Sequence, residues 1–265
     1  MTNGISKIVL AQLLVTLVPL GKAGDAIPTT LATPARKRPV AAKLIRPGIS
    51  GIASITAPGG CLIAEGFSRE ANAAGVATTG MTGFYECAVT RHVAVFAAPG
   101  VWTANRGRNG IGDVSFGPKF VFNRESRLVP LFALGYTYKQ PTAPSGLGSG
   151  FHDHKVTAYV DKSFGLTRVS ANFIVKWEGC ERRPVRQEMQ SLAAFRPVRG
   201  RLGLAAQSFY SESSVVRYGG ALAAAVFNVS PDLSTHVGLE HGFGPKSANL
   251  GVVWGMTYLY RGPRR

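Results

Sequence analysis

The sequence predicts an all-β chain that folds as a transmembrane antiparallel up-and-down β-barrel of about 12 strands. Apolar and polar side chains alternate along many short segments, and connections of hairpin length join those segments. A third observation is an apolar run close to the N-terminus, of the kind that directs export.

The segment 166–178 shows the alternation best. One face carries Val169, Ala171, Phe173, Val175 and Trp177, and the other carries Arg168, Ser170, Asn172, Lys176 and Glu178. Only Ile174 breaks the pattern. Successive side chains of a strand point to opposite faces, so this strand has an apolar and a polar side. A soluble sandwich buries the apolar side, whereas a transmembrane barrel turns it to lipid and keeps polar groups inside.

The start of the chain favours export. Lys7 precedes an apolar run from Ile8 to Leu20, and small residues follow. This order is typical of a secretory signal peptide, which we assign to residues 1–26, with Ala26 preferred over Ala23 as the last residue before cleavage. A buried N-terminal helix is the alternative. A spanning helix needs about 20 apolar residues, so a mature chain in a membrane would have to be a barrel.

Residues 27–50 are expected to form a flexible basic periplasmic arm, because prolines and like charges oppose packing. The net charge of +16 suits anionic lipid headgroups, an anion-attracting lumen or scattered surface charge. The basic residues outside the arm occur mostly singly, without a helix-turn-helix, zinc or RNA-binding signature. Nucleic acid is therefore not expected as a partner.

The barrel itself is expected within residues 51–261, followed by a basic tail at 262–265. The expected strands are 61–69, 81–90, 92–98, 112–123, 128–139, 153–163, 166–178, 188–196, 201–211, 216–229, 232–243 and 248–260. These lengths bracket the roughly 9–11 residues that a tilted barrel strand needs. Segment 188–196 has the weakest pattern, and without it the barrel would have about ten strands.

The last strand combines an apolar face with two terminal tyrosines, which suit an aromatic girdle at a membrane interface. The girdle candidates are Trp177, Trp254, Tyr258 and Tyr260. We expect outer-membrane lipid as one partner of the barrel, and the barrel-assembly machinery, through the C-terminal strand, as another.

Polar side chains on the opposite faces are expected to line the lumen. The candidates are Glu86, Asp113, Lys119, Lys139, Asp153, Lys155, Asp161, Arg168, Asn172, Lys176, Glu178 and Glu240. Paired, these charges would hold the barrel in shape and narrow a path through it; unpaired basic groups would favour anions. The alternative is that they are only the ion pairs that any narrow barrel interior needs.

The three cysteines allow one bridge. Cys61 and Cys87 fall on neighbouring expected strands, so a cross-strand disulfide is one option, although strict bridge geometry cannot be read from spacing. Cys180 then remains as a free thiol in a loop. His152 and His154 flank Asp153 on one strand, but two imidazoles without a third ligand do not make a metal site. No nucleophile elbow or paired-carboxylate spacing is present, and neither an enzyme nor a cofactor is expected.

At several motifs the chain resembles the MetA-pathway of phenol degradation family of outer-membrane proteins. The matching residues are Gly112-Asp113-Val114, Gly117, Lys119, Pro130, Ala133-Leu134-Gly135, Lys139, Pro141-Thr142, Gly146-Leu147-Gly148-Ser149-Gly150, Asp153, Lys162 and Phe164-Gly165. The resemblance covers about residues 50–260 and is strongest at 110–180, while 180–215 matches poorly. It implies an outer-membrane barrel presumed to move small hydrophobic compounds.

The expected function is therefore a passive channel or uptake pore in the bacterial outer membrane for small molecules. The family resemblance implies hydrophobic or aromatic permeants, and the sequence does not identify the permeant itself. A structural, non-conducting barrel is one alternative. The other is a secreted soluble β-barrel that binds a ligand in its cup, with the apolar faces turned inward.

Overall fold

The computed structural model describes residues 51–72, 77–105, 107–179, 184–214, 217–243 and 248–262, all within the unit Ala41–Arg265. The predicted signal peptide, the arm at 27–50, Cys180 and all but Gly262 of the predicted tail lie outside these residues. The described part contains thirteen strands and no helix, so it contains no helix long and apolar enough to cross a membrane.

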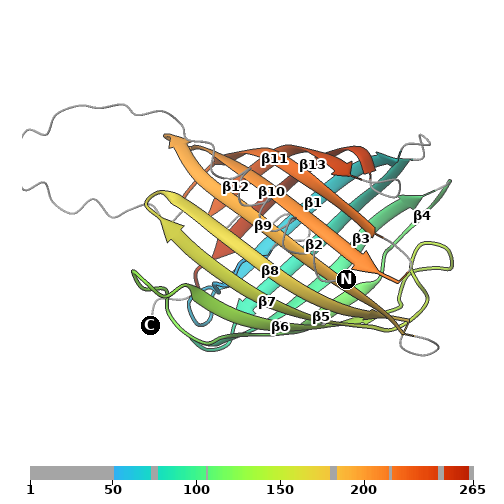
Figure 1. The fold of residues 1–265 in the computed structure, drawn as a ribbon, viewed down its shortest axis with the longest axis horizontal. Coiled ribbons are helices and arrows are strands. Elements are labelled where there is room, and N and C mark those ends of the chain that lie inside the picture. The colour runs from blue at the N-terminus through green and yellow to red at the C-terminus, as the bar shows by residue number, and fades with distance from the viewer. Residues whose placement is uncertain are drawn as a thin grey trace, which may run out of the picture. The chain divides into compact units, whose positions relative to one another are not determined.

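Twelve of these strands close into one antiparallel barrel, as the sequence predicts (Figure 1). The strands are β1 (Cys61–Asn72), β2 (Ala77–Ala88), β3 (Val93–Asn105), β4 (Arg108–Gly110), β5 (Val114–Val121), β6 (Leu131–Gln140), β7 (Asp153–Phe164), β8 (Thr167–Glu178), β9 (Val185–Arg199), β10 (Leu202–Ser213), β11 (Arg217–Asn228), β12 (Leu233–Phe243) and β13 (Ala248–Tyr260). Apart from β4, each strand pairs with its neighbours in chain order, with β3 beside β5, and β1 pairs with β13 to close the ring. The short β4 pairs only with the end of β3.

The two ends of the barrel differ in their connections. At one end, which we call the terminal rim, Cys61 lies beside Tyr260 and short turns join most hairpins. One of them holds Gly165 at a φ of 59°, a left-handed conformation that glycine adopts at little cost. At the other end, the loop rim, the connection 141–152 follows β6.

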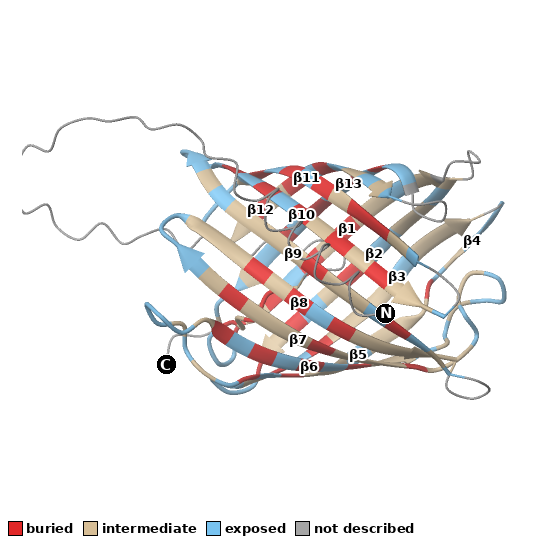
Figure 2. Ribbon diagram, viewed as in Figure 1, coloured by how far each residue is buried: buried red, intermediate tan, exposed pale blue. Residues whose placement is uncertain are grey.

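Buried and exposed side chains alternate along the strands, as the predicted inward and outward alternation requires (Figure 2). Along β13 the side chains of Leu250, Val252, Trp254, Met256, Tyr258 and Tyr260 are exposed on the outside. Between them, Val253 and Thr257 are buried in the interior. The barrel therefore presents an apolar outer face and fills its inside with the alternate side chains.

Strand β9 resolves the choice between ten and twelve strands. Its Val185–Arg199 span is the longest of all at 15 residues, and it pairs with both β8 and β10. The alternation is weak because each face mixes polar and apolar groups: Gln187 and Met189 point inward, while Glu188 and Leu192 point outward.

Strand β3 extends beyond its predicted end at residue 98, through Pro99 and Gly100. Gly100 and Gly112 allow this extension, because a Cβ added at Gly100 would lie 2.6 Å from the Gly112 Cα. The two backbones exchange hydrogen bonds, with the Gly112 N–H donating to the Gly100 carbonyl at 2.8 Å. Because neither residue has a side chain, the backbone of β3 can hydrogen-bond closely to the residues just before β5.

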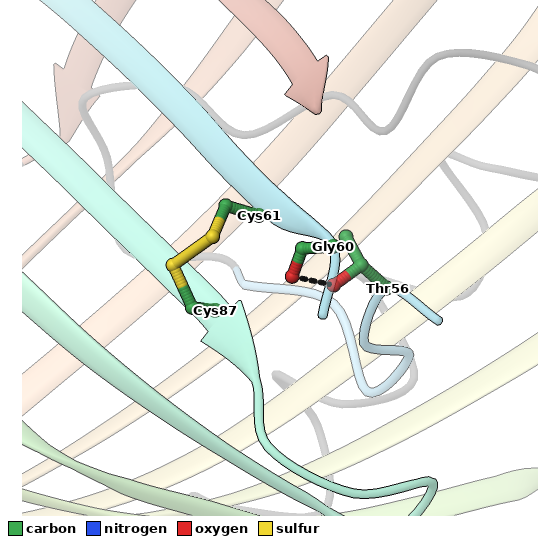
Figure 3. Close-up of a disulfide and its surroundings, with 4 residues drawn as sticks. All are labelled: Thr56, Gly60, Cys61 and Cys87. Carbon is green, nitrogen blue, oxygen red and sulfur yellow. Dashed lines mark hydrogen bonds between the residues drawn. A yellow bond between two sulfur atoms is a disulfide. The ribbon is translucent and has the colours of Figure 1, made fainter. Parts of the chain in front are cut away.

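Cys61 and Cys87 face each other across β1 and β2 and form a disulfide, with their Cα atoms 4.1 Å apart (Figure 3). The bridge lies at the terminal rim. Next to it, the Thr56 hydroxyl donates to the Gly60 carbonyl at 2.7 Å, where the chain turns into β1.

Candidate functional site

The residues that precede β1 occupy the inside of the barrel, and they define the candidate site. Ile52 and Ala53 are buried: Ile52 packs against Leu62 and Ala64 of β1, and Ala53 against Val121, Leu131 and Ala133 of β5 and β6. We call residues 51–56 the inner segment. They carry no strand pairing, so their peptide groups need partners inside the lumen.

The barrel wall supplies those partners through polar side chains. The Gly51 N–H donates to Asn172 Oδ1 at 2.6 Å, and Asn172 Nδ2 donates to the Gly51 carbonyl at 3.1 Å. The Ala53 N–H donates to Asp161 Oδ2 at 2.9 Å, and Lys119 Nζ donates to the Ile52 carbonyl at 2.6 Å. Hydrogen bonds to charged groups are the stronger kind, so these contacts hold the inner segment in one place.

Two ion pairs support these contacts. Lys119 pairs with Glu86 at 3.0 Å, and both side chains are almost fully buried, at 4% and 0% exposure. Arg168 pairs with Asp161 at 2.5 Å and also donates to the Ser54 hydroxyl at 3.0 Å. Each charge that meets the inner segment is therefore compensated by an opposite charge on the wall.

A second group of charges lies at the loop rim. Lys139 contacts Asp113 at 3.1 Å and Asp153 at 2.8 Å. Lys176 contacts Asp153 at 3.4 Å and also pairs with Glu178. Asp153 accepts the Gly179 N–H at 3.0 Å, which joins the rim ends of β7 and β8.

Asp113 connects this group to the loop 141–152. It accepts the Ala143 N–H at 3.1 Å. Burial alone would raise the pKa of its carboxyl, but the Ala143 N–H and the Lys139 ammonium outweigh burial and lower that pKa. The carboxylate therefore stays ionised and holds the loop against the start of β5.

Three cavities follow one another from the loop rim into the lumen. The outermost, of about 780 Å³, is lined by Lys139, Asp153, Lys176 and Glu178, which also line a middle cavity of about 340 Å³. The middle cavity shares Ser115, Thr137, Lys155, Ile174 and Tyr218 with a deep cavity of about 510 Å³. Gly51 and Ile52 line the deep cavity. The space inside the barrel thus opens at the loop rim and reaches down to the inner segment.

Seven of the twelve predicted lumen residues line these cavities, and the other five contact one of those seven or the inner segment, so that the twelve form three groups. Glu86, Lys119, Asp161, Arg168 and Asn172 surround the inner segment. Asp113, Lys139, Asp153, Lys176 and Glu178 form the group at the loop rim. Lys155 and Glu240 line the deep cavity between them.

The inner segment is not predicted from the sequence, where residues 51–60 are expected to belong to the barrel domain. Their one signal is the pair of isoleucines, Ile52 and Ile55, that ends the basic, proline-containing stretch before β1. Sequence reasoning also passed over the aromatic and aliphatic members of the inner face. Those that line the deep cavity include Phe84, Phe96, Tyr159, Phe209 and Tyr218.

The two histidines beside Asp153 face away from the lumen, toward tyrosines. Tyr136 and His154 are hydrogen-bonded through the hydroxyl and Nδ1 at 2.6 Å, and Tyr138 stacks on His152 with ring centroids 5.3 Å apart. Among the described residues, no group of three or more histidine, cysteine or acidic side chains could hold a metal ion.

The girdle candidates lie at different heights on the wall. Trp177 lies near the loop rim, where it is paired with His154 and Arg186. Tyr258 and Tyr260 lie at the terminal rim, and Trp254 lies further along β13. These positions put aromatic side chains near both ends of the barrel.

No family model matches the sequence, and no curated protein matches it as a relative. Solved structures do resemble it. An outer membrane channel from Pseudomonas putida F1 superposes with a TM-score of 0.61 at 12% identity, over 80% of this chain and 100% of that one. The NanC porin gives a TM-score of 0.54 at 5% identity, over 76% of this chain and 98% of that one. At such identities the likeness shows the fold alone.

The buried pair beneath the deep cavity yields a test of the site. Replacing Lys119 with Met leaves the Glu86 carboxylate buried without its partner, which we expect to lower the free energy of unfolding by about 3–5 kcal/mol. Adding Glu86→Leu should recover much of this loss. Arg217→Met is the control, because its pair with Glu212 at 2.6 Å is exposed and such pairs contribute about 0–1 kcal/mol. Denaturant titration of folded protein in lipid vesicles measures all three. Equal losses in Lys119→Met and Arg217→Met would contradict this assignment.

Proposed function

We propose that the chain is an outer-membrane barrel that lets small molecules pass through its lumen, with the inner segment narrowing the path. One observation carries the proposal: the interior holds three cavities with charged walls, which share lining residues in sequence from the loop rim to residues 51 and 52. A barrel with a purely structural role needs only a packed interior.

The outer surface supports residence in a membrane. Large apolar side chains are exposed along the outer face of several strands, among them Phe132 and Leu134 on β6 and Phe173 on β8. A soluble cup-like protein would turn such side chains inward, but here the inward positions are rich in charges. In this proposal the terminal rim faces the periplasm, the loop rim faces outward, and the signal at residues 1–26 directs export.

The resemblance to the MetA-pathway of phenol degradation family supports the finer part of the proposal, that the permeants are small and partly hydrophobic. The residues behind it fall in the site: Asp113 and Lys139 are paired, and Gly148 packs so closely on Asp113 that an added Cβ would lie 2.6 Å from its Oδ1. In this proposal the chain carries out transport and no catalysis, and it reaches the membrane through the barrel-assembly machinery.

A charge on the outer face tests the contact with lipid. Leu134→Arg places a guanidinium on the outer face of β6, which should cost about 2–4 kcal/mol of unfolding free energy if that position lies near the bilayer midplane. Leu128→Arg, at the exposed connection before β6, should cost almost nothing. Unfolding in lipid vesicles measures both, after a mobility shift between boiled and unboiled samples has shown that each variant folds. A soluble protein that tolerates Leu134→Arg as well as Leu128→Arg would exclude the membrane barrel.

Conductance in planar bilayers tests the path itself. We expect a small conductance from the wild type. Asn172→Ala removes both hydrogen bonds to Gly51 and should shift the open-to-closed equilibrium about 5- to 150-fold toward open, since two such bonds contribute on the order of 1–3 kcal/mol. Gln207→Ala is the matched control, because this amide is also buried on the inner face but has no hydrogen-bond partner in the described part of the chain.

Conductance in Asn172→Ala above that of the wild type, with Gln207→Ala unchanged, would support a path that the inner segment restricts. No conductance in the wild type or in either variant would favour the structural, non-conducting barrel instead.

A further inference from the structure

Lys155 differs from the other lysines of the middle cavity. Lys139 and Lys176 each contact carboxylates at the loop rim. Lys155, on the inner face of β7, makes no ion pair or hydrogen bond with any described residue. It lines both the middle and the deep cavity.

The neighbouring strand adds to this positive charge. Lys155 pairs in register with Lys176 of β8, so two ammonium groups start from directly opposed positions on one face. Like charges placed opposite each other on a sheet repel. An anion bound in the cavity beside Lys155 would reduce that repulsion. It would also give the Lys155 ammonium an ion-pair partner, which it lacks among the described residues.

The opposite wall of the deep cavity has the reverse charge. Glu70 of β1 and Glu240 of β12 line the same cavity and flank Gly251 of β13 in register. In the closed strand order, β13 stands across the barrel from β7. The wall with Glu70 and Glu240 would therefore repel the negative end of a molecule in this cavity, and the wall with Lys155 would attract it.

Apolar groups complete the cavity between these walls. Phe84, Phe96, Ile174 and Phe209 line it, and its volume of about 510 Å³ lies within the range of small-molecule sites, roughly 300–1,000 Å³. A rigid apolar body with one charged end fits this combination better than a bare inorganic ion does, because an inorganic ion would leave the aromatic side chains without a partner.

We propose that Lys155 binds the carboxylate of a small molecule whose apolar body lies in the deep cavity, so that the lumen carries a subsite for small apolar carboxylates. This rests on the proposed function, since it names the class of molecule that the same lumen takes. The subsite lies on the loop-rim side of the inner segment, so binding requires no movement of that segment.

Binding of benzoate to the purified full-length barrel in detergent tests the proposal, with benzamide as the uncharged probe of the same shape. The wild type should bind benzoate at least about ten-fold more tightly than benzamide, because a hydrogen bond to a charged group would be lost. Lys155→Gln should remove that preference and Lys155→Arg should retain most of it. Arg127→Gln, a loss of the same charge at the exposed connection before β6, should change nothing. Isothermal titration gives the affinities, and the mobility shift on boiling shows that each variant is folded.

Equal binding of benzoate and benzamide, absence of benzoate binding, or unchanged benzoate affinity in a folded Lys155→Gln variant would each overturn the subsite. These outcomes separate from those of the proposed function. Benzoate binding by a barrel that never conducts would remove the channel and keep the subsite. Conductance without a Lys155-dependent preference for benzoate would keep the channel and remove the subsite.

Discussion

The structure depends on a single constraint: charges enclosed by a narrow barrel must find partners inside it. Asp161 and Lys119 meet it by binding peptide groups of the inner segment as well as Arg168 and Glu86, and the neutral Asn172 adds two hydrogen bonds to Gly51. An unpaired buried charge costs several kcal/mol, and an unpaired buried peptide group about 1–3 kcal/mol. The wall and the inner segment thus stabilise each other.

Closure of the sheet makes this arrangement possible. Pairing of β1 with β13 leaves no free strand edge among the twelve barrel strands, and every residue must face either inward or outward. The outward-facing side chains are mostly apolar, as contact with lipid requires, and the charged side chains of the strands therefore lie mostly on the inner face. The Cys61–Cys87 bridge joins β1 to β2 at the terminal rim, directly after the inner segment has left the lumen.

Charge is distributed unevenly within this interior. Opposite charges pair around the inner segment and again at the loop rim, whereas between the two groups Lys155 faces the cavity across from Glu70 and Glu240. Paired charges support the shape of the barrel. The Lys155 ammonium has no ion-pair partner among the described residues, and in the proposed subsite it is the charge that meets a passing molecule.

Period-two alternation predicted the barrel and the inward side of each charged residue, because that pattern is local to each strand. It placed Lys155 and Asn172 on the inner face from their own neighbours in sequence. Partners across strands depend on register, which is why the pairing of Lys119 with Glu86 could not be predicted. The inner segment escaped prediction for a related reason: it has no periodicity, and its contacts reach residues more than a hundred positions away, as between Gly51 and Asn172.

The central claim is that residues 51–56 lie inside the barrel, and engineered cross-linking tests it most directly. Cysteines at positions 53 and 133, made by Ala53→Cys and Ala133→Cys in a Cys180→Ser background, would belong to one buried cluster. Mild oxidation of the folded protein in vesicles should link them, as read from linked peptides by mass spectrometry. Ala53→Cys with Ala223→Cys, on the outer face of β11, should stay unlinked. If position 53 instead remains unlinked to position 133 and reacts freely with a water-soluble maleimide, the inner segment does not occupy the lumen and the account fails.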